Sequence, residues 1–377
     1  MSRRSGGKGQ KVVISGYYGY NNCGDEAVLL SMINAMKKLR PDARIIVLSR
    51  NPSMTRVSYG VEAVNRWNPA SIVLQLLSCR LLISGGGSLL QDVTSSKSLR
   101  YYLAVIRLAI FFRKSVMIYC QGIGPLNIAK NRAKVAKTLN RCQTITVRDG
   151  HSADLLREIG VKQDIQVTCD PVMALSNDVI DDVDLLALIS KATIAGAASG
   201  IGVAGKPILL AVIRCWRDNR HIAHIARFFD NLIKKGWNVL LAAAHYPGDT
   251  EAFNMITGLM KERPYLLDMC LSAREFMALT SGVDAVFSMR LHGLICAYAM
   301  RTPMIGLSYD PKVDAFMEQA GLGEFCFQFD SFDSDAAESL LPELSANPPQ
   351  AEQQMDIKRR EMREKALETA IIAARLL

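Results

Sequence analysis

Apolar and polar positions follow one repeated pattern along this chain of 377 residues. A short apolar run rich in β-branched residues precedes a loop of Gly, Asn and Asp, and a segment with helical periodicity follows. This order is typical of βαβ units and predicts parallel sheets. The predicted strands are residues 11–16, 44–49, 80–85, 115–120, 144–148 and 165–169 in the first half, and residues 207–214, 237–243, 284–289 and 303–309 in the second.

The alternation is interrupted between residues 176 and 206 by an acidic patch and an Ala/Gly-rich stretch. We therefore expect an α/β protein with two Rossmann-like domains. The predicted segments are a flexible N-terminus (1–11), a first domain (12–176), a linker (177–206), a second domain (207–345) and a C-terminal amphipathic helix that packs back on the body (350–377). A loose, solvated C-terminus is the alternative for the last segment.

The composition narrows the class of protein. With 49% hydrophobic and 21% charged residues the chain is not disordered, and without a long uncharged apolar run or a signal peptide we expect it in the cytoplasm. The 9 cysteines include no CxxC pair, which favours reduced structural thiols over disulfides or a zinc site. The net charge of +9 favours anionic partners: phosphorylated metabolites, nucleic acid or an acidic membrane. Because the positive residues look scattered and no nucleic-acid-binding motif includes them, we do not expect nucleic acid.

The segment SMRLHG (288–293) is the sharpest candidate site. It follows an apolar strand, and ligands of open α/β sheets bind beyond the carboxyl ends of the strands. Arg290 provides a bidentate fork for phosphate or carboxylate, and His292 is suited to move a proton. The helix predicted to begin near Gly293 adds free N–H groups that favour an anion. A buried, hydrogen-bonded histidine is the alternative interpretation of His292.

Polar residues and glycines also follow the strands of the first domain. The loop GYYGYNNCGDE (16–26) lacks the GxGxxG spacing, and the chain has no GxxxxGK[ST] motif, so neither a dinucleotide nor P-loop chemistry is indicated. Asp25 and Glu26 lie at a helix start, where acids also favour the helix dipole. The glycines of GGGSLLQD (85–92) indicate either a close ligand or a tight turn. Arg148 ends another strand and has a structural alternative, an ion pair with Asp149 or Asp170.

Three further features leave alternatives open. Arg214 and His245 each follow a strand of the second domain. His221 and His224 are three residues apart but lack a third metal ligand, so surface or capping positions are favoured. The apolar stretch 101–112 is flanked by cations, which fits a buried helix and, as the alternative, a helix at a membrane surface.

Taken together, GYYGYNNCGDEAVL, ISGGGSLLQD, YCQGIGP, VRD, CDPV and SMRLHG resemble the polysaccharide pyruvyl transferases in order and spacing over most of residues 11–320. The resemblance is greatest to the enzymes that pyruvylate N-acetylmannosamine in secondary cell-wall polymers, which anchor S-layer proteins. It implies a GT-B-like fold with a cleft between the domains, phosphoenolpyruvate as donor, and a 4,6-linked ketal as product. The implied acceptor is a disaccharide of N-acetylmannosamine and N-acetylglucosamine on a polyprenyl diphosphate, met at the inner face of an anionic membrane. The connector 190–206 and the segment AAAHYPGD depart from the family pattern, which puts His245 in doubt.

On this resemblance we assign roles as hypotheses. The catalytic residues would be His292, Arg290 and Asp25, with His292 transferring the proton. The donor would be held by Arg214, Arg290, Arg148, Gly293 and His245. The acceptor would be held by Asn21, Asn22, Glu26, Gly86, Gly87, Gln91 and Gln121. The scheme uses no metal and no cofactor, because phosphoenolpyruvate is a co-substrate. The alternatives are a nucleotide-sugar glycosyltransferase and a non-catalytic glycan-binding protein.

Overall fold

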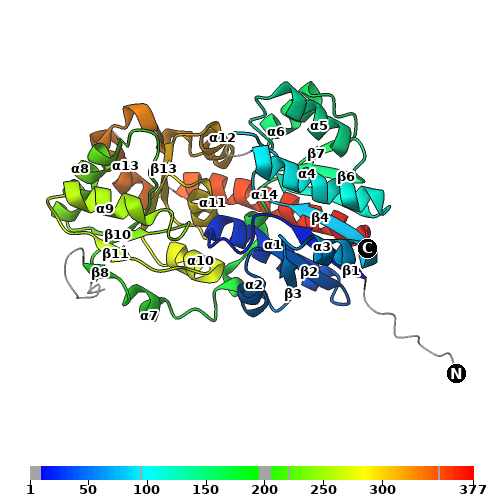
Figure 1. The fold of residues 1–377 in the computed structure, drawn as a ribbon. Coiled ribbons are helices and arrows are strands. Elements are labelled where there is room, and N and C mark those ends of the chain that lie inside the picture. Colours follow the sequence, from blue (N-terminus) through cyan, green and yellow to red (C-terminus); the bar gives the residue numbers. More distant parts are fainter. Residues whose placement is uncertain (1–9, 94–95, 195–204, 220, 347–348) are drawn as a thin grey trace. The chain divides into compact units, whose positions relative to one another are not determined.

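The computed structural model describes residues 10–93, 96–194, 205–219, 221–346 and 349–377 (Figure 1). The chain divides into two compact units. The first unit comprises Met1–Tyr20, Asp25–Ala174 and Met362–Leu377, and the second comprises Asn21–Gly24 and Leu175–Glu361. Most of the expected flexible N-terminus, residues 1–9, lies outside the described residues.

The first unit is built on a parallel sheet of seven strands in the order β3-β2-β1-β4-β5-β6-β7. Its strands are β1 (Lys11–Ser15), β2 (Arg44–Ser49), β3 (Glu62–Asn65), β4 (Leu81–Gly85), β5 (Ser115–Gln121), β6 (Thr144–Val147) and β7 (Ile165–Val167). Its helices are α1 (Cys23–Leu39), α2 (Pro52–Tyr59), α3 (Pro69–Ser78), α4 (Ser96–Phe111), α5 (Ala129–Leu139), α6 (Gly150–Glu158) and the 3-10 turn η1 (Pro171–Ala174). The chain order reverses between β1 and β4, so the loops after these two strands lie at the point where such sheets bind ligands.

The second unit is built on another seven-stranded sheet, in the order β14-β13-β12-β9-β10-β11-β8. Its strands are β8 (Thr193–Ile194), β9 (Ile208–Val212), β10 (Asn238–Ala242), β11 (Tyr265–Leu267), β12 (Ala285–Ser288), β13 (Met304–Ser308) and β14 (Cys326–Gln328). Its helices are α7 (Leu185–Ile189), α8 (His221–Lys234), α9 (Thr250–Leu259), α10 (Ala273–Ser281), α11 (Leu291–Ala299), α12 (Pro311–Ala320), α13 (Ser334–Ala346) and the first part of α14 (Pro349–Arg375), with 3-10 turns η2 (Asn177–Val179), η3 (Gly323–Phe325) and η4 (Phe329–Ser331). Here the order reverses between β9 and β12.

The predicted α/β fold class is confirmed, with parallel sheets in both units. All ten predicted strands form, with their ends within two residues of the predicted ones. Four short strands were not predicted: β3, β8, β11 and β14. The segment expected as a linker, 177–206, differs from expectation, because it contains η2, α7 and β8, and β8 pairs antiparallel with β11; residues 195–204 lie outside the described residues.

Helices α3, α4 and α5 bury their inner faces in a single hydrophobic cluster against one face of the first sheet. The apolar stretch 101–112 lies in α4, where Tyr102, Leu103 and Ile106 are buried, so most of this stretch is core. In α14, Met362, Ala366 and Ala370 are buried, and the Met362 carbonyl accepts from the Cys169 thiol at 2.7 Å. These three apolar positions of the C-terminal helix therefore face the interior of the first unit.

Local chemistry sets several of the helix ends near the strand termini. The Asp149 side chain accepts a hydrogen bond from the Ser152 N–H at 2.7 Å and caps α6. Ser272 and Glu275 form a complete capping box at the start of α10. By contrast, Arg290 provides no side-chain cap for α11, and its carbonyl accepts from the Gly293 N–H at 2.9 Å. The described residues include no helix that is both long and apolar enough to cross a membrane.

Candidate functional site

The carboxyl ends of β9 and β12 place two arginines at equivalent positions in the second unit. Val212 and Ser288 are paired in register, and Arg214 and Arg290 each follow two residues later. Adjacent strands are about 4.8 Å apart, so both guanidinium groups start from neighbouring points on one sheet edge. This edge is also where the strand order of the second sheet reverses. The structure therefore brings the predicted residues Arg214 and Arg290 to one ligand-binding edge.

Arg290 is oriented by a buried carboxylate. Asp249 is fully buried, and its carboxylate accepts from Arg290 Nε at 3.2 Å and from Nη2 in a shorter contact. The Arg290 side chain keeps 18% exposure, and within the described residues Nη1 has no hydrogen-bond partner. Because the fork uses Nε and Nη2, the direction of the guanidinium is fixed while Nη1 stays available for a ligand. The sequence alone did not predict a role for Asp249, because Arg290 is 41 residues away and such a distant partner leaves no local pattern.

Arg214 has no carboxylate partner among the described residues. Its Nη1 donates to the Tyr309 hydroxyl at 3.1 Å, and its guanidinium carbon lies 5.0 Å and 5.3 Å from the ring centroids of Trp216 and Tyr309. Cation–π contacts of this kind orient a cation without neutralising its charge. His221, which was expected at the surface or as a cap, is buried instead, and its Nε2 lies 3.3 Å from the Arg214 carbonyl. Arg214 is thus a half-buried cation held by neutral groups.

His292 lies in the first turn of α11, two residues after Arg290. A Cβ built on Gly24 would fall 2.4 to 2.5 Å from the His292 ring and its Cβ, so only glycine fits at position 24. A Cβ on Gly293 would fall 2.3 Å from the Ser288 hydroxyl, and this hydroxyl donates to the Arg290 carbonyl at 2.8 Å. Both glycines therefore serve the close packing around His292, and the role of Gly293 in donor binding stays a prediction.

Residues Asn21–Gly24 belong to the second unit, although we expected Asn21 and Asn22 in the first. The physical reason is a set of backbone hydrogen bonds. Cys23 N–H donates to the Ala244 carbonyl at 2.7 Å, and Tyr246 N–H donates to the Asn21 carbonyl at 3.0 Å. Asn22 also forms an isolated bridge with His245. Asn21 adopts a left-handed φ of 57°, which asparagine tolerates better than most residues.

In the first unit, Asp25 lies against the glycine turn after β4. A Cβ on Gly87, whose φ is +70°, would fall 2.6 Å from Asp25 Oδ1, and a Cβ on Gly86 would fall 2.0 Å from Val28. The two glycines thus let α1 approach the turn, which is the structural alternative for GGGSLLQD. Gln91 Oε1 accepts from the Val93 N–H at 2.8 Å. The buried Gln121 amide donates to the Ser84 carbonyl and hydroxyl at 2.9 Å and 2.8 Å.

Arg148 belongs to the first unit, whereas Arg214 and Arg290 belong to the second. It is buried and forms ion pairs with Asp149 at 3.5 Å and Asp170 at 3.3 Å, the alternative that the sequence left open. Its Nη2 donates to the Ser88 hydroxyl at 3.3 Å. Two carboxylates already balance its charge, so any role in donor binding stays a prediction.

Arg66 is a buried cation that the sequence analysis did not single out. It is 3% exposed, donates to the Gly16 carbonyl at 2.6 Å, and has no carboxylate partner among the described residues. Its guanidinium carbon lies within 5.4 Å of the ring centroids of Tyr20, Trp67, Tyr101 and Tyr102. Burial works against its charged form, but the surrounding tyrosines hold the pKa of Arg66 above its usual range. Arg66 therefore fixes the loop after β1 through Gly16.

The cysteine thiols are mostly buried, and the described residues include no group of metal ligands. Six of the nine cysteines are buried, and burial raises the pKa of Cys120 to about 11 and that of Cys142 to about 12. Such thiols carry almost no thiolate at neutral pH and are poor nucleophiles. In the described part of the chain, no three His, Cys, Asp or Glu side chains are grouped so that they could hold a metal ion.

Comparison with known proteins gives a family and a fold. A family model described as polysaccharide pyruvyl transferase matches residues 22–311. Among curated proteins, no significant match was found. Similar solved structures include UDP-GlcNAc 2-epimerase from Neisseria meningitidis bound to UDP-GlcNAc, with a TM-score of 0.65, 12% identity, and coverage of 97% of this chain and 100% of that one. Another is the Anabaena protein HepE in complex with UDP and glucose, with a TM-score of 0.57, 14% identity and 97% coverage of both chains. At these identities the similarity establishes the GT-B-type two-domain fold alone.

Glu26, expected to bind acceptor, is buried and holds the loop after β1. Its Oε1 accepts from the Gly19 N–H at 2.7 Å, and its Oε2 accepts from the Tyr59 hydroxyl at 2.5 Å. Burial raises the pKa of Glu26, although both hydrogen bonds oppose the shift. The folded state therefore retains this proton to higher pH than the unfolded chain does. Stability from Glu26 is fully present below the ordinary glutamate pKa and is lost as the pH rises through the raised pKa.

We expect Glu26→Gln to keep an acceptor for the Gly19 N–H, to donate its amide N–H to the Tyr59 hydroxyl oxygen, and to lack this pH dependence. The free energy of unfolding of Glu26→Gln minus that of the native chain should increase as the pH rises from the ordinary glutamate pKa through the raised pKa of Glu26. At higher pH this difference should be constant. Glu26→Leu, which leaves the Gly19 N–H without an acceptor, should destabilise by about 2 kcal/mol. Urea unfolding at a series of pH values measures both effects, and hydrogen exchange of residues 16–26 locates them. A constant difference between Glu26→Gln and the native chain at all pH values would contradict the assignment.

Removing the Asp249 charge should destabilise the second unit. Asp249→Asn leaves Arg290 without its buried counter-ion, and loss of one partner of such a pair costs about 3 kcal/mol. The double variant Asp249→Asn/Arg290→Gln should lose less than the two single variants together, because it leaves no unpaired charge. Denaturant unfolding followed by the fluorescence of Trp216 and Trp237 provides the measurement. Glu251→Gln, an exposed position in the first turn of α9, is the control and should be neutral. Additive single effects would show that the pair is not coupled.

Proposed function

The chain belongs to the polysaccharide pyruvyl transferase family, and on that premise we propose that it transfers pyruvate from phosphoenolpyruvate to a sugar as a 4,6-linked ketal. The acceptor that we propose is N-acetylmannosamine in a polyprenyl-linked cell-wall glycan precursor, met at the cytoplasmic face of the membrane. One observation carries the donor assignment: Arg214, Arg290 and His292 all lie at the point of strand reversal in the second sheet.

The chemistry of the donor matches this edge. Phosphoenolpyruvate has a phosphate and a carboxylate, and two cations with free donor atoms suit two anionic groups. Arg290 presents Nη1 beyond its ion pair, and Arg214 is not neutralised by any carboxylate among the described residues. The first turn of α11, which has no side-chain cap, adds the positive end of a helix dipole, and this favours an anion. These features support a donor pocket in the second unit.

The reaction balances without a cofactor. Two sugar hydroxyl oxygens form bonds to C2 of phosphoenolpyruvate, and the bond from C2 to the phosphate oxygen breaks. One hydroxyl proton is balanced by the proton that C3 gains to become a methyl group, and the other leaves with the phosphate. His292 is assigned this proton transfer, because an imidazole changes charge near neutral pH. The arginines stabilise the charge that develops on the leaving phosphate. Asp25 is the proposed second acid or base in the first unit.

The decisive experiment measures what is released and whether it needs the acceptor. Phosphate release from labelled phosphoenolpyruvate should depend on a synthetic acceptor glycan, with the label appearing in the glycan. Release of UDP from a UDP-sugar would instead support a nucleotide-sugar glycosyltransferase. Glycan binding without turnover of either donor would support a binding protein. Either of these outcomes would overturn the proposal.

Two substitutions separate the roles of the donor residues. His292→Ala should lower kcat by about 10²- to 10⁴-fold, the usual contribution of general acid–base catalysis, with a small effect on donor KM. Arg214→Gln should lower kcat/KM for phosphoenolpyruvate by roughly 10- to 100-fold, because a charge-assisted hydrogen bond is lost. Steady-state kinetics with varied donor measures both. The exposed histidine of α8, as His224→Ala, is the matched control and should leave the kinetics unchanged.

A further inference from the structure

The net positive charge of this chain comes from one run of 56 residues. Between Asp92 and Asp149 there is no Asp or Glu, and the run carries eleven cations: Lys97, Arg100, Arg107, Arg113, Lys114, Lys130, Arg132, Lys134, Lys137, Arg141 and Arg148. Since the whole chain has a net charge of +9, the remainder is slightly negative. The positive residues themselves are spread along the chain as expected, but their excess over the acidic residues lies in this run.

The fold directs this charge outward along two helices. In α4 the residues at successive helical spacings of three and four form an outer stripe of Lys97, Arg100, Ala104, Arg107 and Phe111, all exposed. The other face of α4 is buried in the core. In and just after α5, the spacing 130, 134, 137 and 141 gives a second stripe made only of Lys and Arg. Because α4 and α5 pack together on one face of the first sheet, we refer to these two stripes as the basic face.

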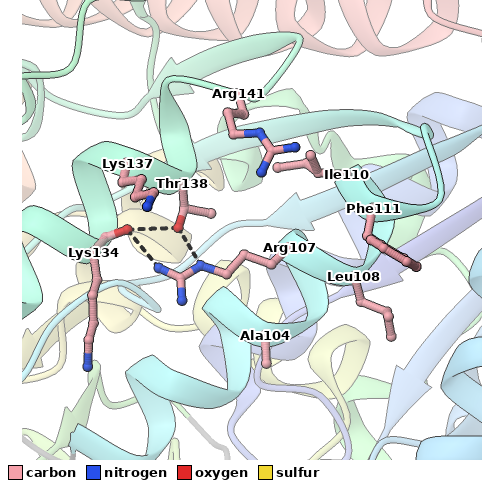
Figure 2. Close-up of a pocket in the computed structure, with 9 residues that line it drawn as sticks. All are labelled: Ala104, Arg107, Leu108, Ile110, Phe111, Lys134, Lys137, Thr138 and Arg141. Carbon is pink, nitrogen blue, oxygen red and sulfur yellow. Dashed lines mark hydrogen bonds between the residues drawn. The ribbon is translucent and has the colours of Figure 1, made fainter.

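A cavity of about 680 Å³ lies in this face between the two helices (Figure 2). Its lining combines apolar and cationic side chains: Ala104, Leu108, Ile110 and Phe111 with Arg107, Lys134, Lys137 and Arg141, beside Thr138. Arg107 Nε donates to the Thr138 hydroxyl at 2.8 Å, and its Nη2 donates to the Lys134 carbonyl at 3.2 Å. Both acceptors are neutral, so Arg107 is fixed at the cavity while no carboxylate among the residues that the structure describes pairs with it.

Stability of the fold does not account for the basic face. Like charges at i and i+4, such as Lys130 and Lys134 or Lys137 and Arg141, repel and weaken a helix. A soluble helix ordinarily mixes both signs on its solvent face. Phe111 is 76% exposed at the rim of the cavity, where it adds nothing to the core. A structure that keeps a repulsive, partly apolar surface is expected to cover it with a partner.

Charge complementarity selects the partner. An anionic bilayer presents a dense layer of phosphates over acyl chains, which matches cations around an apolar depression with one protruding aromatic ring. Nucleic acid would match the charge, and the exposed Phe111 ring is a surface on which a base can stack, but the apolar Leu108 and Ile110 beside it offer a base no hydrogen bonds and suit acyl chains better. We propose that the basic face docks on an anionic phospholipid membrane, with Phe111 inserted at the acyl boundary and Arg107, Lys137 and Arg141 on headgroup phosphates. This inference uses only the first unit and does not depend on the transfer reaction.

The test is flotation of the full chain with phosphatidylcholine vesicles that contain no phosphatidylglycerol or roughly a third of it. We expect binding only to the anionic vesicles, lost when about 0.5 M salt screens the charges. Lys137→Ala/Arg141→Ala should weaken vesicle binding by about 25-fold, since each cation near the surface contributes about fivefold. The matched control is Lys261→Ala/Arg263→Ala, which removes the same charge from exposed positions in the second unit and should bind like the native chain.

Phe111 gives a second, independent readout. Phe111→Ala should weaken binding by about tenfold, because it removes an inserted aromatic side chain. Phe111→Trp should gain fluorescence that brominated lipid chains quench, beyond any quenching of the three native tryptophans. Thermal unfolding checks that these exposed substitutions leave the fold intact.

Three outcomes would overturn the proposal of membrane docking. The first is no binding to anionic vesicles, and the second is an equal loss of vesicle binding in Lys137→Ala/Arg141→Ala and in Lys261→Ala/Arg263→Ala. The third is displacement of the protein from vesicles by an RNA oligonucleotide at equal phosphate concentration. Pyruvyl transfer to a short water-soluble acceptor should be unchanged in Lys137→Ala/Arg141→Ala. Failure of membrane docking and failure of the proposed activity are therefore distinguishable.

Discussion

The buried Asp249 carboxylate connects the parts of the second unit on which its site depends. It fixes the Arg290 guanidinium and accepts the His245 N–H at 3.0 Å. The segment next to His245 holds the backbone of Asn21–Cys23, and Gly24 then packs on the His292 ring. This fully buried carboxylate thus links the segment after β10 to the segment after β12. A charge buried this deeply is retained only with several partners, which explains why Asp249 has donors from two directions.

Arg148, Arg214 with Arg66, and the cations of the basic face are held in different ways, and each way permits a different role. Arg148 is buried between two carboxylates, so its charge is used within the fold. Arg214 and Arg66 are oriented by aromatic rings and neutral oxygens, which preserve the charge. The cations of the basic face are solvated and repel one another. Proposals about anionic partners follow from this distinction, since a cation already neutralised has little left to offer a ligand.

Glycines around the candidate sites serve close packing as much as ligand approach. Gly24 makes room for the His292 ring, and Gly87 makes room for the Asp25 carboxylate. In both places a missing side chain lets a polar, chemically active group reach a backbone turn. The glycine-rich motifs of the sequence therefore indicate where the side chains proposed for catalysis lie, because these side chains pack on the glycines.

The sequence by itself determined the fold class, ten strands of the two sheets and the strand-end positions of Arg214, Arg290 and His292, because hydrophobic periodicity and turn residues are local signals. It missed β3 (EAVN), β8, β11 and β14, since two to four residues are too few to show a period. Only the tertiary structure decided which residues meet: Asp249 with Arg290, Glu26 with Gly19 and Tyr59, and Asn21–Gly24 with the second unit. It also decided that the cations of α4 and α5 share one outer face. Such pairings join positions distant in the chain, and no local pattern encodes the partner of a side chain.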